Sequence, residues 1–210
     1  MTTNARAGLA IIIGSVAGLA TMAMHPTGHD VIASAAAGDG NLLNVGAHSL
    51  AIAGEALLLA AMLAVTARLS SARDLAVTAY VTWALATFCI IVAAVASGFI
   101  ASAVAADAAE LEGAARDLLM NSYHYTGEVN QAFAKVGVSL SGVAIILWSV
   151  AMIRTGFSRA LGWYGISFAA LVLAGLGTGH LRLDIHGFGA VMIGQSVWMI
   201  WTGTLMRQPE

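Results

Sequence analysis

The chain has 210 residues, of which 59% are hydrophobic and 10% are charged, and its mean hydropathy is +0.84. Soluble domains have about a quarter of their residues charged, so this composition excludes a water-soluble globular fold and predicts an integral membrane protein. The net charge of −2 gives no sign of a nucleic-acid partner, and the single Cys89 can form no internal disulfide.

Six apolar stretches are long enough to cross the hydrocarbon core of a bilayer, which takes about 20 helical residues. Helices are the expected spanning element because lipid offers no partner to free backbone groups, and the alternation of an outer-membrane barrel is absent. In chain order, the predicted spans are residues 7–24, 45–66, 75–103, 132–152, 160–179 and 187–206. We therefore predict an all-α six-transmembrane-helix bundle in which residues 1–210 form a single domain.

Arginines indicate the orientation of this bundle, since short cytoplasmic loops are enriched in Lys and Arg. The span ends that would share one side carry Arg6, Arg68, Arg73, Arg154, Arg159 and Arg207. Both termini are therefore expected in the cytoplasm, in a multi-pass protein of the bacterial inner membrane. An interfacial aromatic belt is expected on the same side, formed by Trp148, Trp163, Tyr164, Trp198 and Trp201.

The segment 105–119, between the third and fourth spans, mixes acidic residues with alanine and leucine. This pattern is typical of a short amphipathic helix lying over the outer face, either as a plain connector or as a lid over a site. His124 begins the fourth helix and lies 30 residues before Arg154. That helix should therefore project above the membrane or tilt strongly.

Four histidines lie about one membrane crossing from an arginine of the cytoplasmic side. The separations are 19 residues for Arg6 to His25, 20 for His48 to Arg68, 21 for Arg159 to His180 and 21 for His186 to Arg207. Since a helix rises about 1.5 Å per residue, these imidazoles should share one depth at the outer boundary. His29, in the first outer loop after Pro26, and His124 belong to the same side.

Three carboxylates follow these histidines at helical spacing. Glu55 lies seven residues after His48, on the same face and near mid-membrane, where an unpaired carboxylate is costly and marks a functional candidate. Glu128 follows His124 by four residues, and Asp184 follows His180 by four.

Histidines and carboxylates together predict a transition-metal site for Zn, Fe, Mn or Cu near the outer face. The expected ligands are His25, His48, His180 and His186, with His29 and His124 as further candidates. In a metal-dependent enzyme, the ion would activate a water molecule while Glu55, Glu128 or Asp184 transfers a proton, and a lipid or small amphiphile would suit as substrate.

Three alternatives stay open. Two imidazoles at matching depth could ligate haem b, with Arg182 meeting a propionate. A proton- or cation-coupled transporter could use Glu55 as its inner site. Finally, histidines at a bilayer boundary can be purely interfacial, which would leave a structural protein without a site. The sequence is also compatible with a homo-oligomer.

Overall fold

The computed structural model describes residues 2–208, and no strand occurs among them. The helices are α1 (Thr3–Met24), α2 (Gly28–Ala37), α3 (Leu42–Arg68), α4 (Arg73–Val95), α5 (Ala101–Ala109), α6 (Gly113–Thr155), α7 (Arg159–Gly177) and α8 (Ile185–Met206). A 3-10 turn, η1 (Ser70–Ala72), precedes α4, and a π-helical turn, η2 (Ala96–Ile100), joins α4 to α5. The prediction of an all-α fold is confirmed.

Five segments are long and apolar enough to cross a membrane, which indicates a multi-pass membrane protein. They are Thr3–Met24, Leu42–Arg68, Ser70–Ala109, Gly113–Thr155 and Arg159–Gly177. The last helix, α8, covers the sixth predicted span and has 22 residues, but it is not one of these five. The count of six spans therefore stays a prediction.

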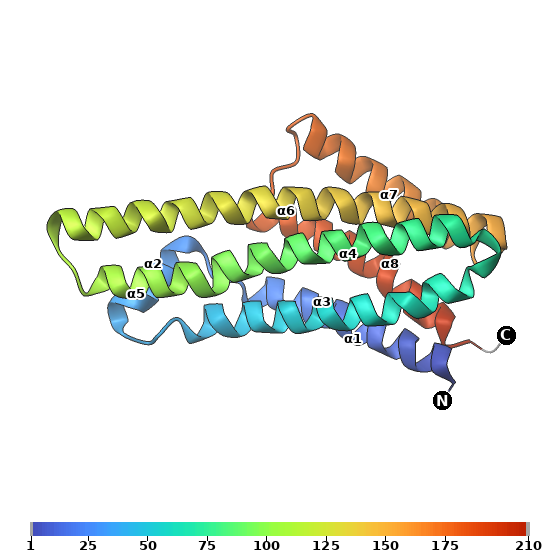
Figure 1. Ribbon diagram of the computed structural model, residues 1–210, viewed down its shortest axis with the longest axis horizontal. Helices are drawn as coiled ribbons and strands as arrows, with labels where there is room; N and C mark the ends of the chain where they lie inside the picture. The colour runs from blue at the N-terminus through green and yellow to red at the C-terminus, as the bar shows by residue number, and fades with distance from the viewer. Residues whose placement is uncertain (1, 209–210) are drawn as a thin grey trace.

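The long helices run side by side along the longest axis of the molecule (Figure 1). Both termini, the α3–α4 connection and the α6–α7 connection lie at one end, which we call the arginine end because the six arginines named above flank it. The α1–α2 and α7–α8 connections lie nearer the middle of the longest axis, at the other ends of α1, α7 and α8, and we call this level the histidine end; the α5–α6 hairpin projects beyond it (Figure 1). Assignment of the arginine end to the cytoplasm rests on its positive charge and stays a prediction.

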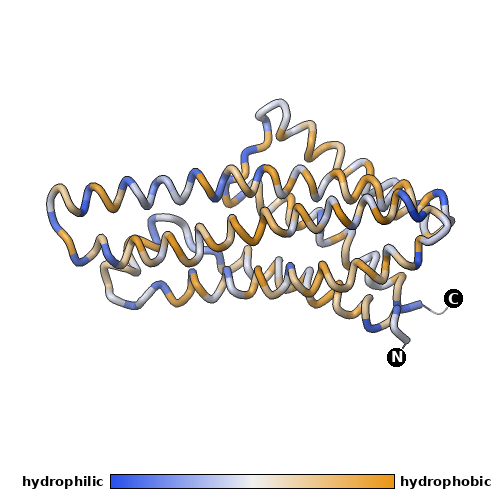
Figure 2. The backbone as a smooth tube through the Cα atoms, viewed as in Figure 1, coloured by the Kyte–Doolittle hydropathy of each residue, from blue (hydrophilic) through white to orange (hydrophobic). Residues whose placement is uncertain are grey.

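The fourth predicted span is part of α6, and this helix projects beyond the other spans. With 43 residues α6 is about 65 Å long, roughly twice the thickness of a hydrocarbon core. Figure 1 shows it lying alongside α4 and α5 rather than steeply across them. The expected amphipathic helix over residues 105–119 is not formed, because a break before Gly113 (φ 59°) divides this segment between α5 and α6. The segment is instead the tip of a hairpin, and Figure 2 shows polar residues gathered there.

Two members of the predicted aromatic belt are core residues. Trp148 and Trp198 are fully buried, with ring centroids 6.2 Å apart, and Trp83 packs on Trp148 at 5.9 Å. The indole N–H groups of the two belt residues find partners within the bundle, since Trp148 donates to Thr66 and Trp198 to Ser149, each at 3.2 Å. These bonds allow a polar indole to be buried, so interfacial water is not needed.

Candidate functional site

Two of the predicted ligands, His25 and His48, are in contact at the histidine end. Their ring centroids lie 4.8 Å apart in an edge-to-face arrangement of 65°. His25 is the C-cap of α1 and has an extended backbone, because a residue before proline is disfavoured in the helical region and Pro26 follows it. His48 lies in the second turn of α3 and is buried, whereas His25 is half-buried.

Both imidazoles are oriented by backbone carbonyl groups. The Nδ1 of His25 lies 2.9 Å from the carbonyl oxygen of Pro26, and the Nδ1 of His48 lies 2.9 Å from that of Asn44. Because a carbonyl oxygen can only accept, each Nδ1 carries the proton, and each neutral ring keeps a lone pair on Nε2. Burial lowers the pKa of His25, while its bond to Pro26 acts in the opposite direction.

The π-helical turn η2 fixes the position of His48. Gly98 of this turn faces the His48 side chain so closely that a Cβ atom there would overlap its Cβ and Cγ. Asn44, one turn before His48, donates its Nδ2 to the Ser97 carbonyl and to the Ser102 hydroxyl, each at 2.9 Å. A π turn interrupts the regular hydrogen bonds of the helical backbone, and the Asn44 amide supplies a donor for the Ser97 carbonyl group.

The histidine pair lines a cavity of about 370 Å³ among α1, α3, α4, α6 and α8, which we call the histidine cavity. Its polar lining also includes Asn130, Gln131 and Asp184. Asn130 donates to the Ala93 carbonyl at 2.9 Å and Gln131 to the Leu183 carbonyl at 3.0 Å, so two amides hold the wall formed by α6 against α4 and the α7–α8 connection.

Asp184 has a defined structural role at the edge of this cavity. Its Oδ1 accepts from the backbone N–H of Gly187 at 2.9 Å and of His186 at 3.1 Å, so it caps the N-terminus of α8. These bonds, that of Gly187 foremost, hold the pKa of Asp184 below its usual range. An ionised cap is a weak proton acceptor at neutral pH.

The remaining predicted residues do not join the pair. The exposed ones are His29, His124, Glu128, His180, Arg182 and His186. Among residues 2–208 no group of three or more His, Cys, Asp or Glu side chains could hold a metal ion. The predicted convergence of four histidines is therefore not found.

Local geometry explains this separation. The α7 helix ends at Gly177, and the turn at Gly179 (φ 74°) leaves His180 at the surface, where its Nδ1 lies 2.9 Å from the Thr178 hydroxyl. In α8, residues two apart point about 200° from each other, so Phe188 lines the cavity while His186 is turned away.

The other predicted side chains line neighbouring grooves. His124 and Glu128 border a groove of about 360 Å³ among α2, α5 and α6. This groove shares Gly28, Ser97, Asn130 and Gln131 with the histidine cavity. Arg182 lines a neighbouring groove of about 710 Å³ between α6 and α7, together with Lys135, and this groove shares Gln131, Leu183 and Asp184 with the histidine cavity. Arg182 thus lies away from the lining of the histidine cavity, where a haem propionate was expected.

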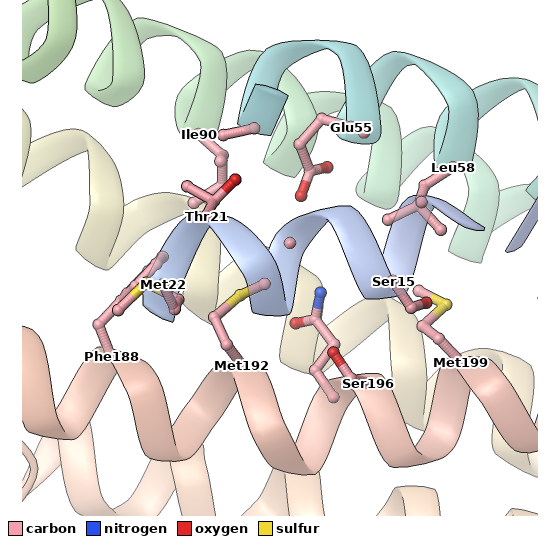
Figure 3. Close-up of a pocket in the computed structure, with 15 residues that line it drawn as sticks. Ser15, Thr21, Met22, Glu55, Leu58, Ile90, Phe188, Met192, Ser196 and Met199 are labelled. Carbon is pink, nitrogen blue, oxygen red and sulfur yellow. The ribbon is translucent and has the colours of Figure 1, made fainter. Parts of the chain in front are cut away.

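Glu55 lies at the midpoint of α3, deeper in the bundle (Figure 3). Its Oε2 accepts from the Thr87 hydroxyl of α4 at 3.3 Å. The carboxylate lines a small cavity of about 50 Å³ among α1, α3 and α8, which we call the Glu55 cavity. Figure 3 shows the carboxylate pointing toward α1, with Met192 and Ser196 of α8 on the far side.

The two cavities meet. Both are lined by Thr21, Met22, Ala51, Ile90 and Phe188. The sequence interpretation placed His48 and Glu55 on one helical face, and both side chains do face this joined space. It missed Asn44, Asn130 and Gln131, although an amide inside or beside an apolar stretch is the signal that could have identified them.

Comparison with models of known families, with curated proteins and with solved structures finds no match for the chain.

Proposed function

We propose that the protein is a membrane metalloprotein that binds one transition-metal ion between His25 and His48. The observation that carries this proposal is the orientation of the pair, in which both Nδ1–H groups are bound to carbonyl oxygens and both Nε2 lone pairs are available. Histidines that ligate metals commonly donate their other N–H to a carbonyl or carboxylate, which fixes the tautomer.

The separation of the rings supports a shared ion. Imidazole nitrogen binds Zn²⁺ at about 2.0 to 2.1 Å, so a ring centroid lies about 3.2 Å from the metal, and two ligands at about 90 to 110° have centroids about 4.5 to 5.2 Å apart. The observed 4.8 Å falls inside this interval. Imidazole ligands suit Zn, Cu and Fe.

The geometry of the pair disfavours bis-histidine haem. Two axial ligands lie on opposite sides of the iron, which would separate the ring centroids by about 6 Å with the macrocycle between them. His25 and His48 instead contact each other edge to face.

Two histidines leave coordination positions open for water or substrate. Asn130, Gln131 and Asp184 line the same cavity, and Ile90 and Phe188 give it apolar walls. A metal ion lowers the pKa of a bound water and makes it a nucleophile, and apolar walls suit an amphiphilic substrate. A metal-dependent reaction on such a substrate is the enzymatic form of this proposal.

Metal titration of the purified protein tests the site. Calorimetry with Zn²⁺, and the absorption spectrum with Co²⁺ as a probe, should give one site per chain, and His25→Ala or His48→Ala should each weaken it by at least about a hundredfold. His180→Ala and His186→Ala are matched controls, because both histidines are exposed and outside the cavity. Undiminished binding in His48→Ala, or equal loss in His186→Ala, would show that the ion binds elsewhere.

A further inference from the structure

Glu55 occupies a position in which a charged carboxylate would be poorly stabilised. In a bilayer such a group normally pairs with a cation or faces water. Its one polar contact is the Thr87 hydroxyl, and among residues 2–208 it is the only side chain lining the Glu55 cavity that titrates. No lysine, arginine or histidine lines that cavity from α1, α4 or α8.

The lining suits a proton better than a metal cation. Hard cations need several oxygen ligands. Four polar side chains besides Glu55 line this cavity, but the hydroxyls of two of them donate to backbone carbonyls of α1, and the other ten lining residues are glycine or apolar; the four are Ser15, Thr21, Gln195 and Ser196. The cavity's volume of about 50 Å³ has room for a few water molecules, since each needs about 10 to 15 Å³ on this measure.

The cavity opens toward the histidine end and is closed in the other direction. Toward the histidine end it shares five lining residues with the histidine cavity, whose titratable groups are His25, His48 and Asp184. Toward the arginine end, Leu58 and Met199 close it, and Met62 and Val65 behind them are fully buried. The joined cavities therefore give water and protons a route to Glu55 from the histidine side.

We infer that Glu55 is a proton-binding site that exchanges with the histidine end through the histidine cavity. The proton leaves the Glu55 carboxyl oxygen for a water molecule in the joined cavities. That water exchanges the proton with water in the histidine cavity, which shares Thr21, Ala51 and Phe188 with the Glu55 cavity. Proton binding at Glu55 does not depend on the metal proposal.

Carbodiimide labelling of the metal-free protein tests the proton at Glu55. Dicyclohexylcarbodiimide reacts with a protonated carboxyl group in apolar surroundings, so mass spectrometry should find Glu55 modified at neutral pH at least about tenfold faster than the exposed Glu128. The rate should fall as pH rises. An unlabelled Glu55, or labelling that sodium suppresses at constant pH, would overturn the inference in favour of an ionised carboxylate or a cation site.

A residue at the junction of the two cavities tests the route. Ala51 lines both, so Ala51→Phe should slow deuterium exchange of the Glu55 carboxyl group, followed by its infrared C=O band, by about tenfold or more. Ala53→Phe is the matched control, because Ala53 lies on the exposed face of α3. If Ala51→Phe does not fold, Ala51→Leu makes a smaller obstruction. Unchanged exchange in a folded Ala51 variant would overturn the route.

Because these measurements use metal-free protein, they are independent of the metal titration. Labelled Glu55 without a metal site would leave the inference standing and remove the proposed function. A metal site with unlabelled Glu55 would do the reverse.

Discussion

Gly98 lies directly against His48, and a Cβ atom at residue 98 would come within 3.0 Å of the His48 Nδ1. This contact joins the π-helical turn η2 to the histidine pair. The π turn in the third apolar span and His48 of the neighbouring helix α3 therefore form a single structural unit. Such turns often occur at functional sites.

Gly98→Ala should displace His48 from His25. The added methyl group overlaps the His48 side chain near its backbone, where a rotamer change cannot relieve the clash. We expect metal affinity to fall by at least about tenfold in calorimetric titration, while the helical circular dichroism is retained. Gly46→Ala is the control, because a Cβ there meets nothing within 4 Å. Equal affinities for the two variants would contradict this account of the site.

Metal binding should persist to a pH below the ordinary pKa range of histidine. Burial lowers the pKa of His25, so its Nε2 stays unprotonated while free imidazole is already charged. As pH falls through this lowered pKa, protons compete with the metal and affinity decreases. Metal titrations at a series of pH values measure the midpoint of this decrease in affinity. A midpoint above the value for free histidine would contradict the predicted direction.

Lowering the pH should also destabilise the fold near His25. Because the folded protein binds the proton less readily than the unfolded chain does, acidification between the two pKa values favours unfolding. The midpoint of thermal unfolding in detergent should therefore decrease over that interval, and His25→Gln should reduce the decrease. An unchanged pH dependence in this variant would assign the effect to another group.

Asp184→Ala and Asp184→Asn should separate a helix cap from a proton acceptor. Asparagine can still accept the hydrogen bonds from Gly187 and His186, whereas alanine cannot. Asp184→Ala should lower the thermal stability and Asp184→Asn should remain close to the parent protein. If a metal-dependent activity is found, its retention in Asp184→Asn would support capping, and its loss in that folded variant would support a chemical role.

Asn44→Ala should destabilise the joint between α3 and η2. Its amide donates to the Ser97 carbonyl and the Ser102 hydroxyl, and a buried acceptor left without a donor costs about 1 to 3 kcal/mol. Reversible unfolding in detergent measures this loss. Ser49→Ala removes a hydroxyl on the exposed side of the same helix and should have little effect. Comparable losses in both would show that the Asn44 bonds contribute little.

The chain order of apolar and charged residues was sufficient to predict the long helices and the arginine end, but not α2, which holds His29 where a loop was expected. Lipid cannot hydrogen-bond to a free backbone, so an apolar stretch of about 20 residues must be helical, and its two ends are then about one bilayer apart. This argument places His25, His48, His180 and His186 near one end, as the structure has them. It also placed Glu55 at the middle of a span.

Only the tertiary structure decided which of these side chains meet. Depth along a helix does not specify rotation about its axis, and two residues separate the cavity-facing Phe188 from the exposed His186. The extended backbone before Pro26 turns His25 toward His48, while the turn at Gly179 leaves His180 outside. Rotation, helix ends and the π turn at Gly98 depend on packing among several helices, and that packing is not encoded in the spacing of residues along one of them.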